Sequence, residues 1–211
     1  NNSPDTLRQL SFHLYLNAFR PGSRWADADS IEHNRRFNDL KDPNFGFNHV
    51  SNVRIMGQAV EAIYPFAPDS TIVRFMLPRP LTPGDSLVAD MDWDARPSIP
   101  PRRQGRRGRA FDFAQWYPRV VVYDQYGWEE HPMYPAGEFY GEFGTFLVRL
   151  NVAEDQVVGA KGVDDADGSR FLADRSAGAG HLAGSAAGDD GFFVGADQQH
   201  LLEQLPRVDF V

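Results

Sequence analysis

Short runs in which apolar and polar residues alternate recur along most of the chain. The clearest is residues 10–16, where four apolar side chains fall on one face, as in a half-buried β-strand. Similar patterns or apolar runs predict further strands at residues 49–56, 71–77, 87–93, 110–123 and 138–150. Strands at this spacing, with no long helical pattern, indicate an all-β fold, an antiparallel β-sandwich or saddle.

Proline and glycine separate these predicted strands. Gly57-Gln58 indicates a turn into a returning strand at residues 60–64. Pro78-Arg79-Pro80 should end the strand before it, because proline has no amide hydrogen for the strand ladder. Pro83-Gly84 occupies the central positions of a tight turn.

Two polar segments lack the alternation. We expect residues 23–46 to form a surface excursion with one helical turn, and residues 95–109, rich in Pro and Arg, to form a loop. The run 102–109 contains five arginines, which could hold an anion, although a solvated loop is the simpler interpretation.

The composition changes after about residue 153. Gly, Ala and Asp dominate residues 159–197, which contain too few large apolar side chains to offset the entropy of ordering the chain. We expect a β-domain at residues 1–155 and a poorly structured tail at 156–211, with a short helix near residues 198–205.

Net charge and cysteine content limit the function. The formal net charge is −8, so the chain has no general attraction to nucleic acid. The absence of cysteine excludes disulfides and Cys-based zinc sites, and no stretch approaches the ~20 apolar residues of a membrane helix. The chain opens on a turn at Asn1 without an initiator Met, and we expect a processed or truncated start.

Several segments resemble, in order, the N-terminal domain of bacterial aminopeptidase N-like zinc metallopeptidases. They are residues 2–7, 12–19, 69–71, 77–81, 83–86, 115–119, 123–124, 127–128, 138–144 and 157–162. The resemblance implies a β-saddle that packs beside a catalytic domain and closes one side of its substrate cavity. The family's first strands would be missing here, leaving an unpaired edge through which we expect self-association.

The same resemblance implies the partners and the chemistry. The partners would be the catalytic domain of the same parent protein and a peptide substrate, from which the parent removes N-terminal residues. The family's zinc is expected only in that missing catalytic domain. The resemblance also suggests export to the periplasm or the cell exterior.

Zinc hydrolysis by this chain itself is not expected. A zinc aminopeptidase needs His-Glu-x-x-His on a helix, and none of the six histidines begins that motif. Glu129-Glu130-His131 is the nearest approach, in the wrong order, and the family's Gly-x-Met-Glu-Asn motif is also absent. We therefore predict no catalytic residue, no metal ligand and no cofactor in this chain.

Gln115 is the candidate substrate-binding residue. It resembles the family Gln or Glu that hydrogen-bonds the free α-amine of the substrate, and an amide oxygen can accept from an ammonium group. The alternative is a Gln that satisfies backbone groups beside a buried Trp116. Arg119 and Asp124 could form an ion pair nearby.

Other functions stay open at this point. The chain could be a free-standing β-sandwich that binds a protein or a carbohydrate without catalysis. Trp116, Tyr117, Trp128 and Tyr134 could form a sugar platform, although a core or an interface is the simpler interpretation. The acidic clusters at 164–167 and 189–190 lack the spacing of a calcium loop. The residue types alone do not exclude Ser-His-Asp catalysis, but no Gly-x-Ser-x-Gly motif is present.

Overall fold

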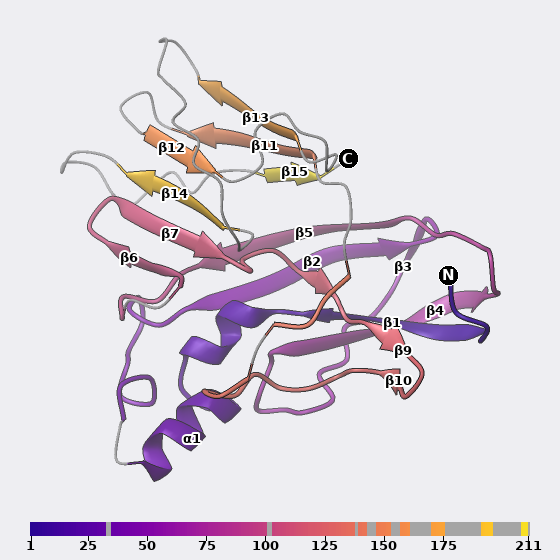
Figure 1. The fold of residues 1–211 in the computed structure, drawn as a ribbon, viewed down its shortest axis with the longest axis horizontal. Coiled ribbons are helices and arrows are strands. Elements are labelled where there is room, and N and C mark those ends of the chain that lie inside the picture. The colour runs from indigo at the N-terminus through magenta and orange to yellow at the C-terminus, as the bar shows by residue number, and fades with distance from the viewer. Residues whose placement is uncertain are drawn as a thin grey trace. The chain divides into compact units, whose positions relative to one another are not determined.

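The structure, a computed structural model, describes residues 1–32, 35–100, 103–137 and 139–142, and beyond them only short strands. Strands dominate these residues, most of them pair antiparallel, and one α-helix accompanies them (Figure 1). The prediction of an all-β fold is confirmed.

The chain forms two compact units. Unit 1 comprises Asn1–Ser98 and Gln115–Glu142, and unit 2 comprises Ile99–Ala114 and Phe143–Val211. The chain therefore leaves unit 1 after Ser98 and returns to it at Gln115. The domain boundary that the sequence suggests at residue 155 stays a prediction.

Unit 1 contains two three-stranded sheets and a hairpin. One sheet has the order β4-β1-β8, with β1 at Leu7–His13, β4 at Ile72–Leu81 and β8 at Arg119–Val120. The other has the order β3-β2-β5, with β2 at Phe47–Ile55, β3 at Gln58–Ala59 and β5 at Ala89–Arg96. The hairpin pairs β9, Tyr123–Asp124, with β10, Gly127–Trp128.

The two sheets of unit 1 share one apolar core. Strands β1, β2 and β4 and the residue after β1 supply its buried side chains: Phe12, Leu14, Val50, Val53, Ile55, Val73 and Phe75. Phe12 and Phe75 meet edge to face, with ring centroids 6.0 Å apart. Burying such side chains contributes about 1.5–3 kcal/mol each, so this core is a major source of stability in unit 1.

Strand β1 begins and ends three residues earlier than the alternation at residues 10–16 predicts. It ends at His13, and the chain then turns into a 3-10 helix, η1, at Tyr15–Phe19. Leu14 and Leu16 are still completely buried, so the apolar pattern identified buried positions correctly but not their backbone conformation.

Strand β2 matches its prediction and contains a bulge. Asn52 has a positive φ of 50°, and the register with β5 shifts between Ser51 and Arg54. The extra residue changes which positions face the core, from Asn48 and Val50 to Val53 and Ile55. The turn that follows lies at Met56–Gly57, one position earlier than predicted, and β3 ends before residues 60–64.

Strand β4 continues through two prolines, contrary to our prediction. It lies at the edge of its sheet, and its register with β1 shifts between Leu7 and Gln9, next to Pro78 and Pro80. Prolines are tolerated at an edge or a bulge because no ladder hydrogen bond is lost there. The turn at Pro83-Gly84 forms as predicted, with Gly84 at φ 83°.

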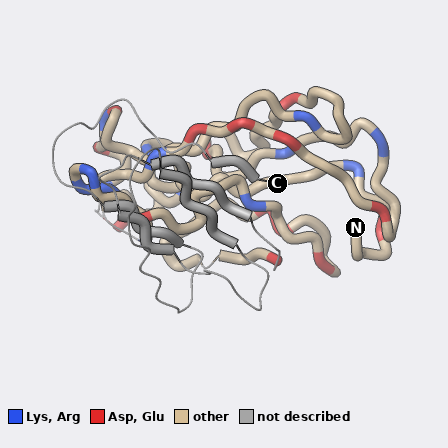
Figure 2. Tube along the Cα trace, turned by 90° about the horizontal axis from the view of Figure 1, so that it is seen from above, with Lys and Arg blue, Asp and Glu red and all other residues tan. Residues whose placement is uncertain are grey.

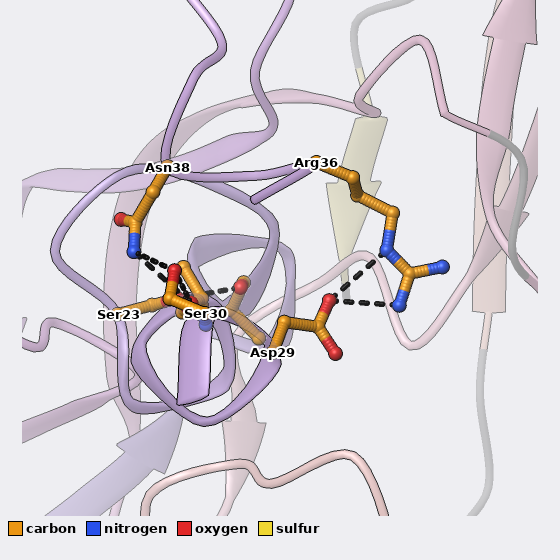
Figure 3. A network of polar contacts seen from close by, with 7 residues as sticks. Ser23, Asp29, Ser30, Arg36 and Asn38 are labelled. Carbon is orange, nitrogen blue, oxygen red and sulfur yellow. Dashed lines mark hydrogen bonds and ion pairs between the residues drawn. The ribbon is translucent and has the colours of Figure 1, made fainter. Parts of the chain in front are cut away.

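Residues 23–46 contain a helix, as expected, but they are not a surface excursion, because Trp25 and Phe37 are buried. Arg24–Ile31 forms helix α1, and Phe19, Trp25 and Phe37 belong to a second buried cluster. Figure 3 shows the polar contacts around α1: Ser23 caps it by accepting from the Ala26 amide at 3.0 Å, and Arg36 donates to Asp29 at 2.7 Å. These contacts let a polar sequence form ordered structure.

Two other predicted segments differ. The run 110–123 is not one strand, because β7 ends at Ala114 and the chain resumes as β8 and β9. The segment 95–109 is not only loop, since β5 extends to Arg96 and Gly105–Arg107 forms β6. The predicted strand at 138–150 is described as a strand only from Leu147.

Unit 2 contains two small sheets. One has the order β12-β14-β7-β6, with β6 at Gly105–Arg107, β7 at Ala110–Ala114, β12 at Val157–Ala160 and β14 at Gly191–Gly195. The other has the order β13-β11-β15, with β11 at Leu147–Val152, β13 at Arg170–Arg175 and β15 at Val208–Phe210. The helix predicted near 198–205 lies outside the described residues, as does most of the tail, whose poor structure stays a prediction.

Candidate functional site

Gln115 lies where the chain re-enters unit 1, in a backbone conformation that is rare for its residue type. Its φ is 52°, in the left-handed region, and only 5% of the residue is exposed. A residue with a β-carbon held in this region is worth attention as a functional position. The conformation ends β7 and turns the chain into the segment that leads to β8.

The side chain of Gln115 is held by Arg119. The guanidinium Nη1 donates to Gln115 Oε1 at 2.8 Å, and Nη2 donates to the Glu142 carbonyl at 3.4 Å. Gly141 lies against the same guanidinium, so closely that a β-carbon there would overlap it. Arg119 thus joins the start of β8 to the segment 139–142.

This geometry bears on both interpretations of Gln115. Trp116 is buried, as the structural interpretation expects, and its carbonyl accepts from Asn48 Nδ2 at 2.8 Å. For the substrate-amine interpretation, one lone pair of Gln115 Oε1 already accepts from Arg119, and the second could accept from an ammonium group. The amine contact stays a prediction, and the neighbouring positive charge would weaken it.

His13 lies next to this pair at the end of β1. It faces Arg119 across the β1–β8 register, and its ring stacks on Tyr15 with centroids 4.5 Å apart. Burial, followed by the charges of Arg119 and His131, lowers the pKa of His13 to about 4, against a weaker opposing effect of Glu130. Burial raises the pKa of Tyr15 to about 12. Both side chains are therefore uncharged at neutral pH.

Glu130 connects the segment after β10 to the first sheet. Its carboxylate accepts from Gln9 Nε2 at 3.1 Å, from the Ser11 hydroxyl and from both Nε and Nη2 of Arg74. Burial alone would raise the pKa of Glu130, but the hydrogen bonds from Arg74 and Ser11 and the charge of Arg74 lower it. The ionised carboxylate thus joins β1, β4 and the segment that carries it.

This cluster does not have the geometry of a hydrolase. The Ser11 hydroxyl donates to Glu130 and not to His13, and His13 Nδ1 has no hydrogen-bond partner in the described part of the chain. Glu130 is a base within hydrogen-bond reach of Ser11, but despite burial Arg74 and Ser11 hold its pKa below the usual range, and the buried Ser11 hydroxyl is out of reach of a substrate. Across the residues that the structure describes, no three His, Asp or Glu side chains are grouped to hold a metal ion.

The four aromatic residues considered as a sugar platform do not share one surface. Trp116 and Tyr117 are buried and meet edge to face at 6.0 Å. Trp128 is half-buried against Tyr123, with ring centroids 5.3 Å apart, and only Tyr134 is exposed. A core role thus accounts for two of the four.

The charged candidates are also dispersed. Asp124 accepts from the Tyr126 amide at 2.8 Å and from the Tyr140 hydroxyl at 3.4 Å. The suggested ion pair between Arg119 and Asp124 is not among the ion pairs of the described residues. In the arginine run, Arg109 is buried and Gln104 almost completely so, which a purely solvated loop would not require. Arg102 and the acidic clusters at 164–167 and 189–190 lie outside the described residues.

Sequence reasoning missed the partner of Gln115 and the role of Glu130. Arg119 lies four positions after Gln115, but only the left-handed turn brings the two side chains together. Glu130 is 119 positions from Ser11, a separation at which no local pattern carries a signal.

A scan against protein-family models, a search of curated proteins and a search of solved structures each gave no match. Among the described helices, none has the length and apolar character needed to cross a membrane.

Proposed function

We propose that this chain is the non-catalytic N-terminal part of an aminopeptidase N-like zinc peptidase. In this role it is a scaffold and one wall of the cavity that holds a peptide substrate. The observation that carries the proposal is Gln115, a buried polar residue in a left-handed conformation, within one of the segments that resemble the family. A conformation of this kind is retained where the surrounding structure enforces it, often at functional sites.

Other residues in or next to the segments of the resemblance hold structural positions in unit 1 that suit a scaffold. Asn1 donates from Nδ2 to the Leu81 carbonyl at 3.0 Å and so fixes the N-terminal turn against the end of β4. Asp69 accepts from the Arg24 amide at 2.7 Å and from the Thr71 amide at 2.8 Å. These contacts stabilise the start of α1 and the segments at both ends of β4, as a scaffold role requires.

In the intact protein, the zinc and the water-activating Glu would belong to a catalytic domain. Gln115 would contribute one hydrogen bond to the free α-amine of the peptide. Because Arg119 shares the same oxygen, this bond is expected to contribute about 1 kcal/mol rather than the larger value of an unshared charged hydrogen bond.

The test compares three forms of the intact protein: wild type, Gln115→Ala and the control Gln58→Ala, whose side chain is exposed in β3. The expected result is a fall in kcat/KM for aminoacyl substrates of about five- to tenfold in Gln115→Ala and no change in Gln58→Ala. Equal kcat/KM in all three forms would remove the amine contact. A coding sequence with no His-Glu-x-x-His in the same reading frame would remove the whole proposal.

A further inference from the structure

The turn of the β9–β10 hairpin presents an aromatic side chain that the fold does not use. Tyr126 is 82% exposed, and Tyr140, on the segment 139–142, is 51% exposed. Exposed tyrosine rings are enriched at the centres of binding surfaces, because they bury a large area with little loss of side-chain entropy.

One carboxylate brings these two residues together. Asp124 Oδ1 accepts from the Tyr126 amide at 2.8 Å, and Asp124 Oδ2 accepts from the Tyr140 hydroxyl at 3.4 Å. Asp124 thus contacts the backbone of Tyr126 and the side chain of Tyr140, two residues that are 14 positions apart in the chain. No basic side chain within the described ranges forms an ion pair with Asp124.

The surroundings of Tyr140 are acidic. The pKa of Tyr140 is raised, first by desolvation and then by the negative charges of Asp124, Glu142 and Glu129. Glu129 is held by His131 at 2.5 Å. Arg119 is a cation close to this segment, and its guanidinium donates to Gln115 and to the Glu142 carbonyl. Figure 2 marks charged positions along the chain, with acidic positions also close to the N-terminus.

We infer that these residues, Asp124, Tyr126, Glu129, Tyr140 and Glu142, form a docking surface for an arginine- or lysine-rich peptide segment; we call it the hairpin surface. A guanidinium can lie over a tyrosine ring while it donates to a carboxylate at the ring edge. The hairpin surface supplies a tyrosine ring and a carboxylate in contact with each other, at Tyr140 and Asp124.

Charge selects this occupant over others. A phosphate-bearing ligand would meet three carboxylates, and a second copy of the chain would bring a like net charge of −8. The inference does not depend on the aminopeptidase proposal, since it uses no residue of the amine contact.

The test uses the full chain and a fluorescent peptide of alternating Gly and Arg. The control peptide replaces each Arg with citrulline, which keeps the shape and removes the charge. Fluorescence anisotropy should show binding that weakens at least about fivefold for the citrulline peptide and for Tyr126→Ala and Asp124→Asn. Tyr126→Phe should bind like wild type, because the ring is kept.

Asp94→Asn is the matched control, since Asp94 is an exposed carboxylate of β5 and its loss changes net charge equally. If Asp94→Asn and Asp124→Asn weaken binding to the same extent, binding follows net charge and the hairpin surface is refuted. Equal binding of both peptides also refutes it. Binding of a cello-oligosaccharide without binding of the arginine peptide would also refute the hairpin surface as a peptide site. A dimer in sedimentation that Tyr126→Ala converts to a monomer would refute it too, because the surface would then bind a second copy of the chain.

Discussion

The buried imidazole of His13 sets how the stability of unit 1 should change with pH. His13 is only 4% exposed, and burial with the charges of Arg119 and His131 lowers its pKa from 6.5 to about 4. The unfolded chain therefore binds a proton at a pH where the folded chain does not. The stability that neutral His13 contributes is complete above pH 6.5 and is lost as the pH falls toward 4.

The size of the effect follows from that lowered pKa. A change from 6.5 to about 4 corresponds to about 3 kcal/mol in total. Between about pH 7 and about pH 5.5, the loss from this one residue is about 1 kcal/mol. The pKa of Glu130 is lowered below 4.5, so the stability that its ionised carboxylate contributes is lost only below that pH. Glu130 therefore does not affect the change between about pH 7 and about pH 5.5.

Urea unfolding measured by tryptophan fluorescence reports on the relevant unit, because all four tryptophans lie in unit 1. The informative variant is His13→Phe, which keeps an aromatic ring to stack on Tyr15 and cannot titrate. His49→Gln is the control, since His49 is exposed on β2. Wild type and His49→Gln should lose about 1 kcal/mol more than His13→Phe between the two pH values. An equal loss in all three proteins would refute the reasoning.

Two further predictions concern single positions of unit 1. Asp69→Ala should lower the free energy of unfolding by about 2 kcal/mol, because the Arg24 amide at the start of α1 and the Thr71 amide lose their acceptor; urea titration measures it. Asn52→Ala should lower the free energy of unfolding by about 1–2 kcal/mol, because alanine adopts the φ of 50° at this position less readily than asparagine. Asn52→Gly should lower it less, because glycine adopts a positive φ freely. A lower melting temperature for Asn52→Gly than for Asn52→Ala would contradict the bulge.

The sequence predicted the core strands better than their ends. The alternation around Val53, Val73 and Phe75 reflects burial on one face, which is a local property of a strand. The end of β1 at His13 depends on the turn into η1, and the passage of β4 through Pro78 depends on its place at a sheet edge. Neither is visible in a local pattern.

The misjudged segment 23–46 shows a second limit. The polar composition of this segment suggested a surface excursion, but its polar side chains bind within the fold. Asp29 accepts from Arg36, and Asn38 donates to the Ala26 carbonyl of α1. At the candidate site, the sequence identified Gln115 by resemblance, whereas the turn that gives it Arg119 as a partner is a tertiary feature. Hydrogen-bond partners of this kind are specified by the whole fold.

The interrupted course of unit 1 has a consequence for synthesis on the ribosome. Strand β1 needs β8, and Ser11 needs Glu130, which follows 119 positions later. At typical translation rates this interval is of the order of ten seconds, during which the unpaired side of β1 is exposed. The segment Ile99–Ala114 of unit 2 is translated within the same interval. During this interval β1 of the nascent chain lacks its partner β8, and a chaperone that binds β1 would prevent it from pairing with another chain.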